Sequence, residues 1–300
     1  MTAAPTDARR KAIVALAVLG VIWGYNWVTM KQAMIDSGPL DFSAMRFGIG
    51  ALTLVPVMMF MKVSFGIPRR EWHTLAWLSF FLVANFGFVM TALIVGGAGK
   101  ISVLVYTMPF WGLILARFML HEHLKPWQWW TVGLAFVGLV VLIDPLHQQG
   151  SVTSSVLAVV AGLFWAGSVV MVKEMQRRES VPMITLTFWQ ISIGALGFLL
   201  ASFIFPQRAI TWTPLLIWCI FYSAVLSTSV AWLLFYYALK RMPAGLAGLS
   251  TLATPVVGVI AAWLVLGERP NSIEATGMAL IGSALAMLAL VPIIVKKANA

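Results

Sequence analysis

Two fourteen-residue stretches of the chain match each other: PFWGLILARFMLHE at residues 109–122 and PVVGVIAAWLVLGE at residues 255–268. Each begins with Pro-x-x-Gly, continues with mostly apolar residues and ends in Leu-x-Glu. The matched positions lie 146 residues apart throughout. Because the motif keeps its internal spacing without a gap, the match indicates an internal duplication of about half the chain.

Shorter matches extend this duplication. At offsets of 142 to 144 residues, the matched pairs are Trp23 with Trp165, IGAL at 49–52 with IGAL at 193–196, and Gly-x-x-x-x-Gly at 133–138 with the same pattern at 277–282. The small change in offset corresponds to short gaps in connecting segments. We therefore expect two repeats, residues 1–146 and residues 147–300.

The composition excludes a soluble protein. Hydrophobic residues make up 61% of the 300 residues, charged residues 10%, and the mean hydropathy is +0.92. A soluble domain carries about 25% charged residues, so this chain has too little charge to cover a globular surface. At about 20 apolar residues per membrane-spanning helix, the chain has enough for nine or ten spans. Little length is left for a soluble catalytic domain or a nucleic-acid-binding domain.

Long apolar runs, separated by short clusters of charged residues, Pro and Gly, predict ten spans. Their approximate ranges are 11–31, 42–62, 72–94, 99–119, 126–143, 152–173, 182–205, 212–239, 244–266 and 271–295. Runs such as LAFVGLVVLI at 134–143 are apolar on every side, whereas a membrane β-barrel requires alternation. The predicted fold class is therefore an all-α integral membrane protein with five spans in each repeat.

The distribution of Lys and Arg predicts the orientation of the chain. If the N-terminus faces the cytoplasm, the inner segments hold fifteen basic residues and the outer segments four, with Arg46 near the outer start of the second span. Such an excess is typical of cytoplasmic loops, so both termini are expected to be cytoplasmic. Five is an odd number, so the second repeat enters the membrane in the opposite orientation. Inverted repeats of this kind occur in many transporters.

Ten spans in a five-plus-five repeat, with a Pro-x-x-Gly helix ending in Leu-x-Glu before a Gly-rich helix in each half, resemble the EamA-type members of the drug/metabolite transporter superfamily. The Trp-rich first and sixth spans are similar to the YddG-like branch of bacterial inner-membrane exporters of aromatic and other amino acids. The resemblance implies alternating access around a central cavity. It also implies that spans one, three, four, six, eight and nine line much of that cavity, with spans five and ten peripheral.

Aromatic and uncharged polar residues lie deep in these spans. An indole in the middle of a span needs a partner for its N–H, which favours the protein interior or a wet cavity over lipid. Together they are typical of a binding site for an amphipathic, moderately bulky solute. The predicted substrate-binding residues are Trp23, Tyr25, Asn26, Asn85, Tyr106, Pro109, Trp111, Trp165, Ser168, Trp189, Gln190 and Pro255. Hydrogen bonding between helices explains each polar residue taken singly, and both readings stay open.

Pro109 and Pro255 occupy equivalent positions near the middle of their spans. Proline lacks a backbone donor and leaves a carbonyl one turn earlier without its partner. Helices broken in this way often mark the binding region or a hinge of a transporter. A simple kink is the alternative, and the duplication of the position favours the functional reading.

Charged residues are placed at the ends of the spans. All ten carboxylates fall in the tail, in loops or at helix ends, so none is available as a mid-membrane coupling group. This predicts facilitated export, or coupling through a group at the mouth of the cavity. Glu122 and Glu268 are expected to make helix-end hydrogen bonds or to pair with Lys125 and Arg269. Arg46 is expected to extend towards the outer surface, the alternative being contact with a solute carboxylate.

No pattern indicates catalysis, a metal or a cofactor. His-Glu-x-x-His and Gly-x-Ser-x-Gly are absent from the sequence, and His121 and His123 are expected in a solvated turn. A channel would require a continuous polar line through the spans, which the chain lacks.

The sequence therefore predicts an exporter of amino acids, aromatic and other neutral ones included, or of similar small metabolites. A multidrug or nucleoside-type exporter of the same superfamily is the alternative. The expected partners are a small-molecule substrate and the lipid bilayer, without nucleic acid. The oligomeric state is left open, and a monomer is compatible with the sequence.

Overall fold

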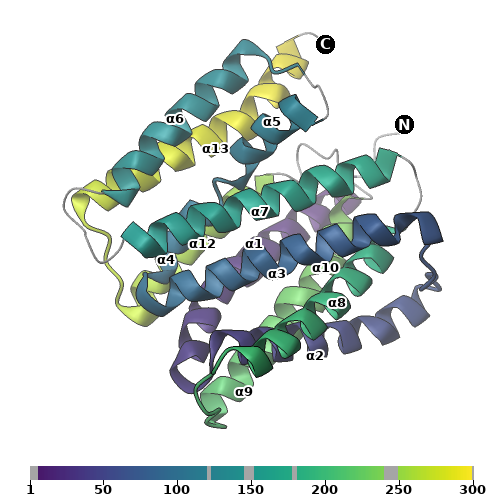
Figure 1. The fold of residues 1–300 in the computed structure, drawn as a ribbon. Coiled ribbons are helices and arrows are strands. Elements are labelled where there is room, and N and C mark those ends of the chain that lie inside the picture. The colour runs from purple at the N-terminus through teal and green to yellow at the C-terminus, as the bar shows by residue number, and fades with distance from the viewer. Residues whose placement is uncertain (1–5, 120–122, 145–151, 178–180, 240–248, 299–300) are drawn as a thin grey trace.

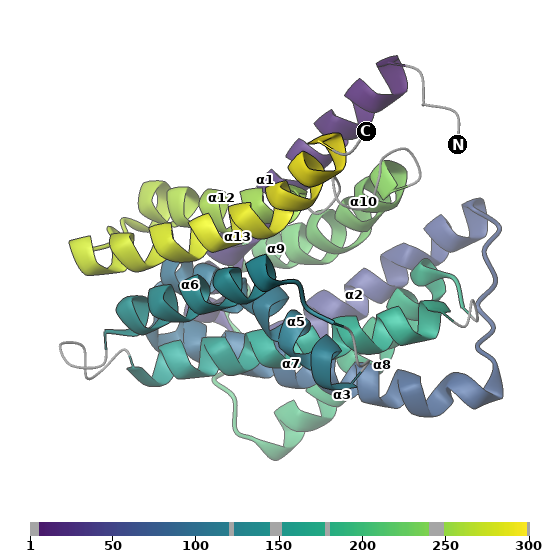
Figure 2. The same ribbon diagram turned by 90° about the horizontal axis from the view of Figure 1, so that it is seen from above.

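The computed structural model describes residues 6–119, 123–144, 152–177, 181–239 and 249–298. These residues form helices and connecting turns, with no strand among them. The beginning of α1 and the end of α13 lie on the same side of the bundle (Figures 1 and 2). Leu120, His121 and Glu122, which end the first Pro-x-x-Gly stretch, lie outside the described residues.

The helices follow the predicted apolar runs closely. In chain order they are α1 (Thr6–Asp36), α2 (Pro39–Phe60), the short η1 (Arg69–Glu71), α3 (Trp72–Val95), α4 (Ala98–Val105), α5 (Met108–Met119), α6 (Pro126–Ile143), α7 (Val152–Arg177), α8 (Met183–Ile204), α9 (Pro214–Phe221), η2 (Tyr222–Val230), α10 (Ala231–Leu239), α12 (Leu249–Leu266) and α13 (Ser272–Ala298). Three of them, α2, α6 and α9, begin with proline, whose fixed φ suits the first turn of a helix.

Nine helical segments in the described ranges are long and apolar enough to cross a membrane. Three of these segments consist of consecutive helices, namely η1 with α3, α4 with α5, and α9 with η2 and most of α10. The ninth expected span corresponds to α12, which has 18 residues, as many as α6. The prediction of an all-helical integral membrane protein agrees with this structure.

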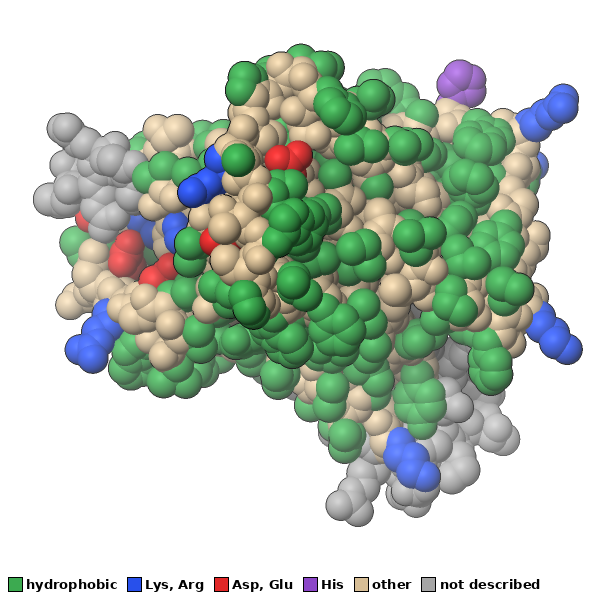
Figure 3. Space-filling model, turned by 90° about the horizontal axis from the view of Figure 1, so that it is seen from below, with side chains coloured by type: hydrophobic (Ala, Val, Ile, Leu, Met, Phe, Trp, Pro, Cys, Tyr) green, Lys and Arg blue, Asp and Glu red, His purple; other side chains and the backbone are tan. Residues whose placement is uncertain are grey.

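The lateral surface of the bundle, between its two ends, is apolar. Phe60, Trp130 and Phe203 expose 91%, 77% and 79% of their surface. Figure 3 shows hydrophobic side chains across the middle of one face and Lys and Arg side chains towards its two ends. Such a surface would be unstable in water and matches the hydrocarbon layer of a membrane between its two polar boundaries.

The fourth expected span is two helices instead of one. Helix α4 ends at Val105, Tyr106 and Thr107 form a turn, and α5 begins at Met108. Pro109 is the second residue of α5, where its missing N–H costs no helical hydrogen bond. The equivalent Pro255 lies inside the continuous helix α12. The expectation of equivalent breaks is therefore wrong for Pro255, since a proline within a helix can be accommodated by a kink alone.

The eighth span changes its helical pitch in the middle. Residues Tyr222–Val230 form the π-helix η2 between the α-helices α9 and α10. The Thr228 hydroxyl donates to the Ser223 carbonyl five residues earlier, at 2.9 Å. π-Helical turns are rare and frequently occur at functional sites.

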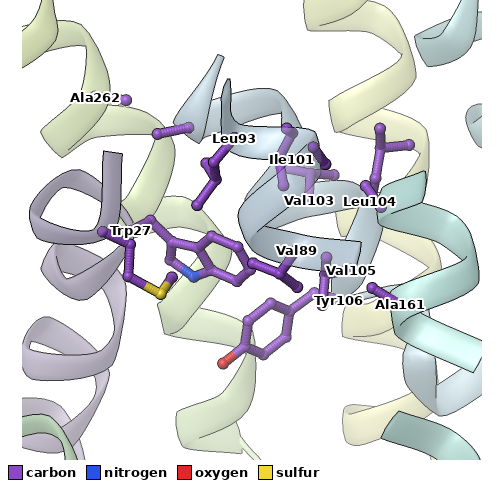
Figure 4. Close-up of a cluster of buried hydrophobic side chains, with 14 of the residues drawn as sticks. Trp27, Val89, Leu93, Ile101, Val103, Leu104, Val105, Tyr106, Ala161 and Ala262 are labelled. Atoms are coloured by element: carbon purple, nitrogen blue, oxygen red, sulfur yellow. The ribbon is translucent and has the colours of Figure 1, made fainter. Parts of the chain in front are cut away.

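The helices pack in a regular set of pairs. Helix α1 packs along α12, α2 along α8, α3 along α7 and α6 along α13. In addition, α1 contacts α9, η2 and α10, while α7 contacts α4 and α5. These contacts bury an apolar cluster to which α1, α3, α4, α7 and α12 contribute (Figure 4).

We name the two ends of the bundle by the predicted orientation. The end that carries residues 37–38, 96–97 and 205–213 is called the outer end, and the end that carries residues 61–71 is called the inner end.

Candidate functional site

Three aromatic side chains, two from helices and one from a turn, meet inside the bundle. The ring of Tyr106, in the turn between α4 and α5, lies edge-on to Trp165 of α7 at 5.4 Å between centroids and to Trp27 of α1 at 6.5 Å. Tyr106 is 4% exposed, and its side chain is hydrogen-bonded to that of Thr254 in α12. Figure 4 shows its hydroxyl pointing away from the labelled apolar side chains. We call Trp27, Tyr106 and Trp165 the aromatic triad.

A cluster of uncharged polar groups lies between α1 and the π-helix. The Asn26 side-chain oxygen accepts from the Ser223 hydroxyl at 2.9 Å, and the Thr29 hydroxyl lies 3.3 Å from the same oxygen. All three residues are buried. Next to them, Tyr25 packs edge-on against Tyr222, with 5.2 Å between ring centroids. The π-helix therefore supplies polar groups to the face of α1 that carries Asn26.

Trp23 belongs to a neighbouring aromatic group. Its indole N–H donates to the Ser227 carbonyl of the π-helix at 3.0 Å. Its ring lies edge-on to Trp232 at 5.9 Å and beside Phe235 at 6.1 Å. Although Trp23 and Trp165 match in the repeat, one contacts α10 and the other contacts Tyr106 at the helix break.

Two predicted amides connect α3, α7 and α8. Asn85 donates to the Ala161 carbonyl at 2.7 Å. Gln190 donates to the Leu78 carbonyl at 3.0 Å and to the Ser168 hydroxyl at 3.2 Å. In this structure both side chains make the helix-to-helix bonds that were the alternative reading.

Two predicted tryptophans lie in other surroundings. The Trp111 N–H donates to Thr107 at 3.2 Å, and its ring packs on Phe136 of α6. Trp189 donates to the Phe65 carbonyl at 2.7 Å, in the segment 61–71 at the inner end. Neither ring contacts the aromatic triad, so the predicted set divides into several groups. Pro109 lies three residues after Tyr106, and Pro255 directly follows Thr254, the hydrogen-bond partner of Tyr106.

Sequence reasoning missed part of this arrangement. Trp27, Thr29, Ser223 and Thr254 were not among the predicted site residues. Trp27 lies one helical turn after Trp23, so its depth in the first span could have identified it as a site residue. The contribution of Ser223 depends on the π-helix, and that of Thr254 depends on the approach of α12.

Arg46 does not extend to the surface. It is 3% exposed and is covered by Met30, Phe47 and Phe86, so the expectation that it reaches the outer surface is wrong. The apolar side chains of α1, α2 and α3 close over the guanidinium before it can reach the helix end.

Hydrogen bonding to a helix end explains Glu268 without a substrate. Its carboxylate accepts from the backbone N–H groups of Ala98 at 2.9 Å and Gly99 at 3.1 Å, in the first turn of α4. This is the expected helix-end hydrogen bond, made to another helix instead of its own. A pair with Arg269 is not formed, because Arg269 is exposed and the carboxylate faces α4. Glu122, which matches Glu268 in the first repeat, lies outside the described residues.

The remaining charges also lie near helix ends. Lys100 pairs with Glu274 at 3.1 Å, and the buried Glu71 lies 3.3 Å from Arg70. Among the residues that the structure describes, no three His, Cys, Asp or Glu side chains are grouped so that they could hold a metal ion. His121 lies outside the described residues.

Several known proteins are similar to this chain over most of its length. The chain is 29% identical over 296 residues to the "Probable amino-acid metabolite efflux pump" of Salmonella typhimurium, covering 94% of both chains. It is 28% identical over 269 residues to the "Uncharacterized transporter YoaV" of Bacillus subtilis, covering 86% of this chain and 90% of that protein. A crystal structure at 17% identity has a TM-score of 0.66 and covers 96% of this chain and 97% of its own, which indicates a shared fold.

The sequence model of one family matches the chain twice, over residues 10–143 and over residues 153–290. Together these two matches cover most of the chain, whose described residues are helical with an apolar lateral surface. The chain therefore belongs to the EamA-like transporter family.

Proposed function

We propose that the protein exports neutral amino acids, aromatic ones included, across the bacterial inner membrane. The observation that carries this proposal is the uncharged character of two buried groups: the aromatic triad and the polar cluster between α1 and η2. Rings offer a large contact area to an apolar side chain, and amide or hydroxyl groups orient the polar end. The relative named as a probable amino-acid metabolite efflux pump supports the same substrate class. The Trp-rich first and sixth spans are the basis for proposing the YddG-like branch.

Alternating access between two inverted repeats, residues 1–146 and 147–300, is the proposed mechanism. The packing supports it, because exchanging each helix with its counterpart reproduces the main helix-to-helix contacts. The pairing of α1 with α12 becomes the pairing of α7 with α4 and α5, and the pairing of α3 with α7 becomes that of the α9–η2–α10 segment with α1. The pairs α2 with α8 and α6 with α13 map onto themselves. Two arrangements of equivalent contacts are what an exchange between inward-open and outward-open states requires.

Export is proposed to follow the solute gradient. In the described ranges, every carboxylate lies at or near a helix end. Proton-coupled carriers commonly place ionisable groups within the membrane. The proposed partners are a small-molecule substrate and the lipid bilayer, without a cofactor or nucleic acid. Both termini of the protein are proposed to face the cytoplasm.

Trp165→Ala is expected to reduce phenylalanine counterflow in proteoliposomes by roughly fivefold, since loss of an edge-on aromatic contact costs about 1 kcal/mol beyond buried area. Trp23→Ala should weaken transport as well, because Trp23 positions the π-helix through Ser227. Trp130→Ala is the matched control, because its ring is exposed on the outer surface of α6.

A panel of amino acids and hydrophobic cations tests the substrate class in the same assay. Exchange of cations without exchange of amino acids would replace the proposal by the multidrug alternative. Unchanged uptake of every solute in both Trp165→Ala and Trp23→Ala would remove the aromatic site from the account.

A further inference from the structure

Arg46 is a buried cation that has no carboxylate partner among the described residues. The side chain is 3% exposed, and none of the ion pairs in the described ranges involves it. Its Nη1 lies 2.8 Å from the thioether sulfur of Met30 on α1, and its buried Nε has no hydrogen-bond partner. The protein therefore offers this guanidinium a weak acceptor on one edge and nothing on the edge that carries Nε.

Two phenyl rings contact the guanidinium. The Arg46 Cζ lies 4.9 Å from the ring centroid of Phe47 and 4.8 Å from that of Phe86. Such contacts attract a cation, but they offset only part of the hydration free energy that a buried charge loses. Positive charge thus remains poorly compensated at this position, and uncompensated charge inside a membrane protein is usually retained for function.

The second repeat shows that packing does not require this charge. Gln190 lies 144 residues after Arg46 and occupies the matching position in α8, the helix that packs against α2. Its neutral amide is satisfied by the Leu78 carbonyl and the Ser168 hydroxyl. A neutral donor is therefore sufficient at this position of the repeat, and only the first copy carries a cation.

The position of Arg46 is suited to a solute that leaves the aromatic triad. Arg46 is the eighth residue of α2, which places it about 10 Å below the outer end at 1.5 Å per residue. Met30, which contacts it, lies one turn after Trp27 on the same face of α1. The guanidinium therefore lies one helical turn further outwards than the triad.

We propose that Arg46 binds the carboxylate of the transported solute, beside an apolar wall formed by Met30, Phe47 and Phe86. The Nε–H and the adjacent Nη2 group provide the two parallel donors that a carboxylate accepts. The ligand class is a monocarboxylate with an apolar side chain, which includes the neutral amino acids. This inference rests on the proposed function for the identity of the solute, and it adds the group that recognises one end of it.

The test compares phenylalanine with phenylalaninamide, in which the carboxylate is replaced by a neutral amide. In proteoliposome counterflow, Arg46→Gln, which introduces the residue of the second repeat, is expected to reduce phenylalanine exchange by roughly 10- to 100-fold, the range for a hydrogen bond to a charged group. Exchange of phenylalaninamide should change by less than about twofold. Arg208→Gln is the control: Arg208 is also an arginine near the outer end, and it donates to the Met34 carbonyl from an exposed position. Equal effects of Arg46→Gln on both solutes, or no effect on either, would overturn the proposal.

A second measurement does not depend on transport. Without a ligand, Arg46→Gln is expected to melt at a higher temperature than the wild type in detergent, because an uncompensated buried charge has been removed. Added 3-phenylpropanoate should raise the melting temperature of the wild type and leave that of Arg46→Gln unchanged. A variant that melts lower than the ligand-free wild type would show that Arg46 stabilises the fold and would refute the proposal. Stabilisation by 3-phenylpropanoate through Arg46, in a protein that exchanges no amino acid, would keep the carboxylate site and reject the proposed function.

Discussion

Gly277→Ala is expected to lower the free energy of unfolding by about 3 kcal/mol, the upper part of the range for overpacking. A Cβ atom at Gly277 in α13 would lie 2.6 Å from the backbone nitrogen of Leu142 in α6 and 2.8 Å from its Cα. Backbone atoms cannot rotate away as a flexible side chain can, so the two helices would have to separate. Denaturation in mixed micelles measures the difference.

Gly282→Ala provides the matched control for this prediction. Gly282 lies five residues later in the same helix, and a Cβ there would have no atom within 4 Å. Its replacement should be neutral or slightly stabilising, because alanine favours the helix. Equal stabilities for the two variants would show that α6 and α13 do not pack as closely as described.

Glu268→Ala is expected to lower the free energy of unfolding by about 2–4 kcal/mol, because two charge-assisted hydrogen bonds are lost. The N–H groups of Ala98 and Gly99 would lose their acceptor in a partly buried place. The negative charge at the start of α4 also interacts favourably with the helix dipole. Helix α4 has eight residues and leads directly into the turn that carries Tyr106. We therefore expect that loss of the Glu268 contact also displaces Tyr106 and weakens transport.

Arg269→Ala separates this contact from a general effect of charge near the outer end. Arg269 is the next residue and is exposed. The carboxylate of Glu268 fits closely against Gly97, where an added Cβ would lie 3.0 Å from it. Because Arg269 is exposed, Arg269→Ala should leave the free energy of unfolding within about 0.5 kcal/mol of the wild-type value, as most surface changes do. A comparable loss in both variants would contradict a specific role for Glu268.

The sequence predicted the positions of the helices well. Apolar runs of about 20 residues have few alternatives in a membrane, because every backbone group must be hydrogen-bonded within the chain. The boundaries of α2, α6 and α8 differ from the expected ranges by a few residues at most. The number of spans, the inverted repeat and the side of the termini remain predictions.

The interruptions of the helices were harder to foresee. Proline was a sound signal at Pro109 and misleading at Pro255, because the same residue tolerates both a helix start and a kink. Nothing in YSAVLSTSV at 222–230 signals a π-helix, since its formation depends on hydrogen bonds and packing with α1 and α2.

The candidate site was predicted only in part. Depth in the span indicated two residues that contact each other in the structure, the buried Tyr106 and the partly buried Trp165. Composition could not decide which rings share a contact, so Trp111 and Trp189 were grouped with residues that they do not touch. Arg46 was placed near the right end of its helix, but its burial depends on Met30 and Phe86, which come from other helices.

Cysteine labelling of the two halves tests the central claim most directly. A cysteine is introduced at Gly150, between α6 and α7, or at Asn299, and intact cells are treated with a membrane-impermeant maleimide. The native Cys219 is buried, so it adds little background. Two oppositely oriented repeats of five spans predict labelling of position 150 in intact cells and of position 299 only after permeabilisation. Labelling of both positions from the same side would contradict the inverted repeat and the alternating access that depends on it.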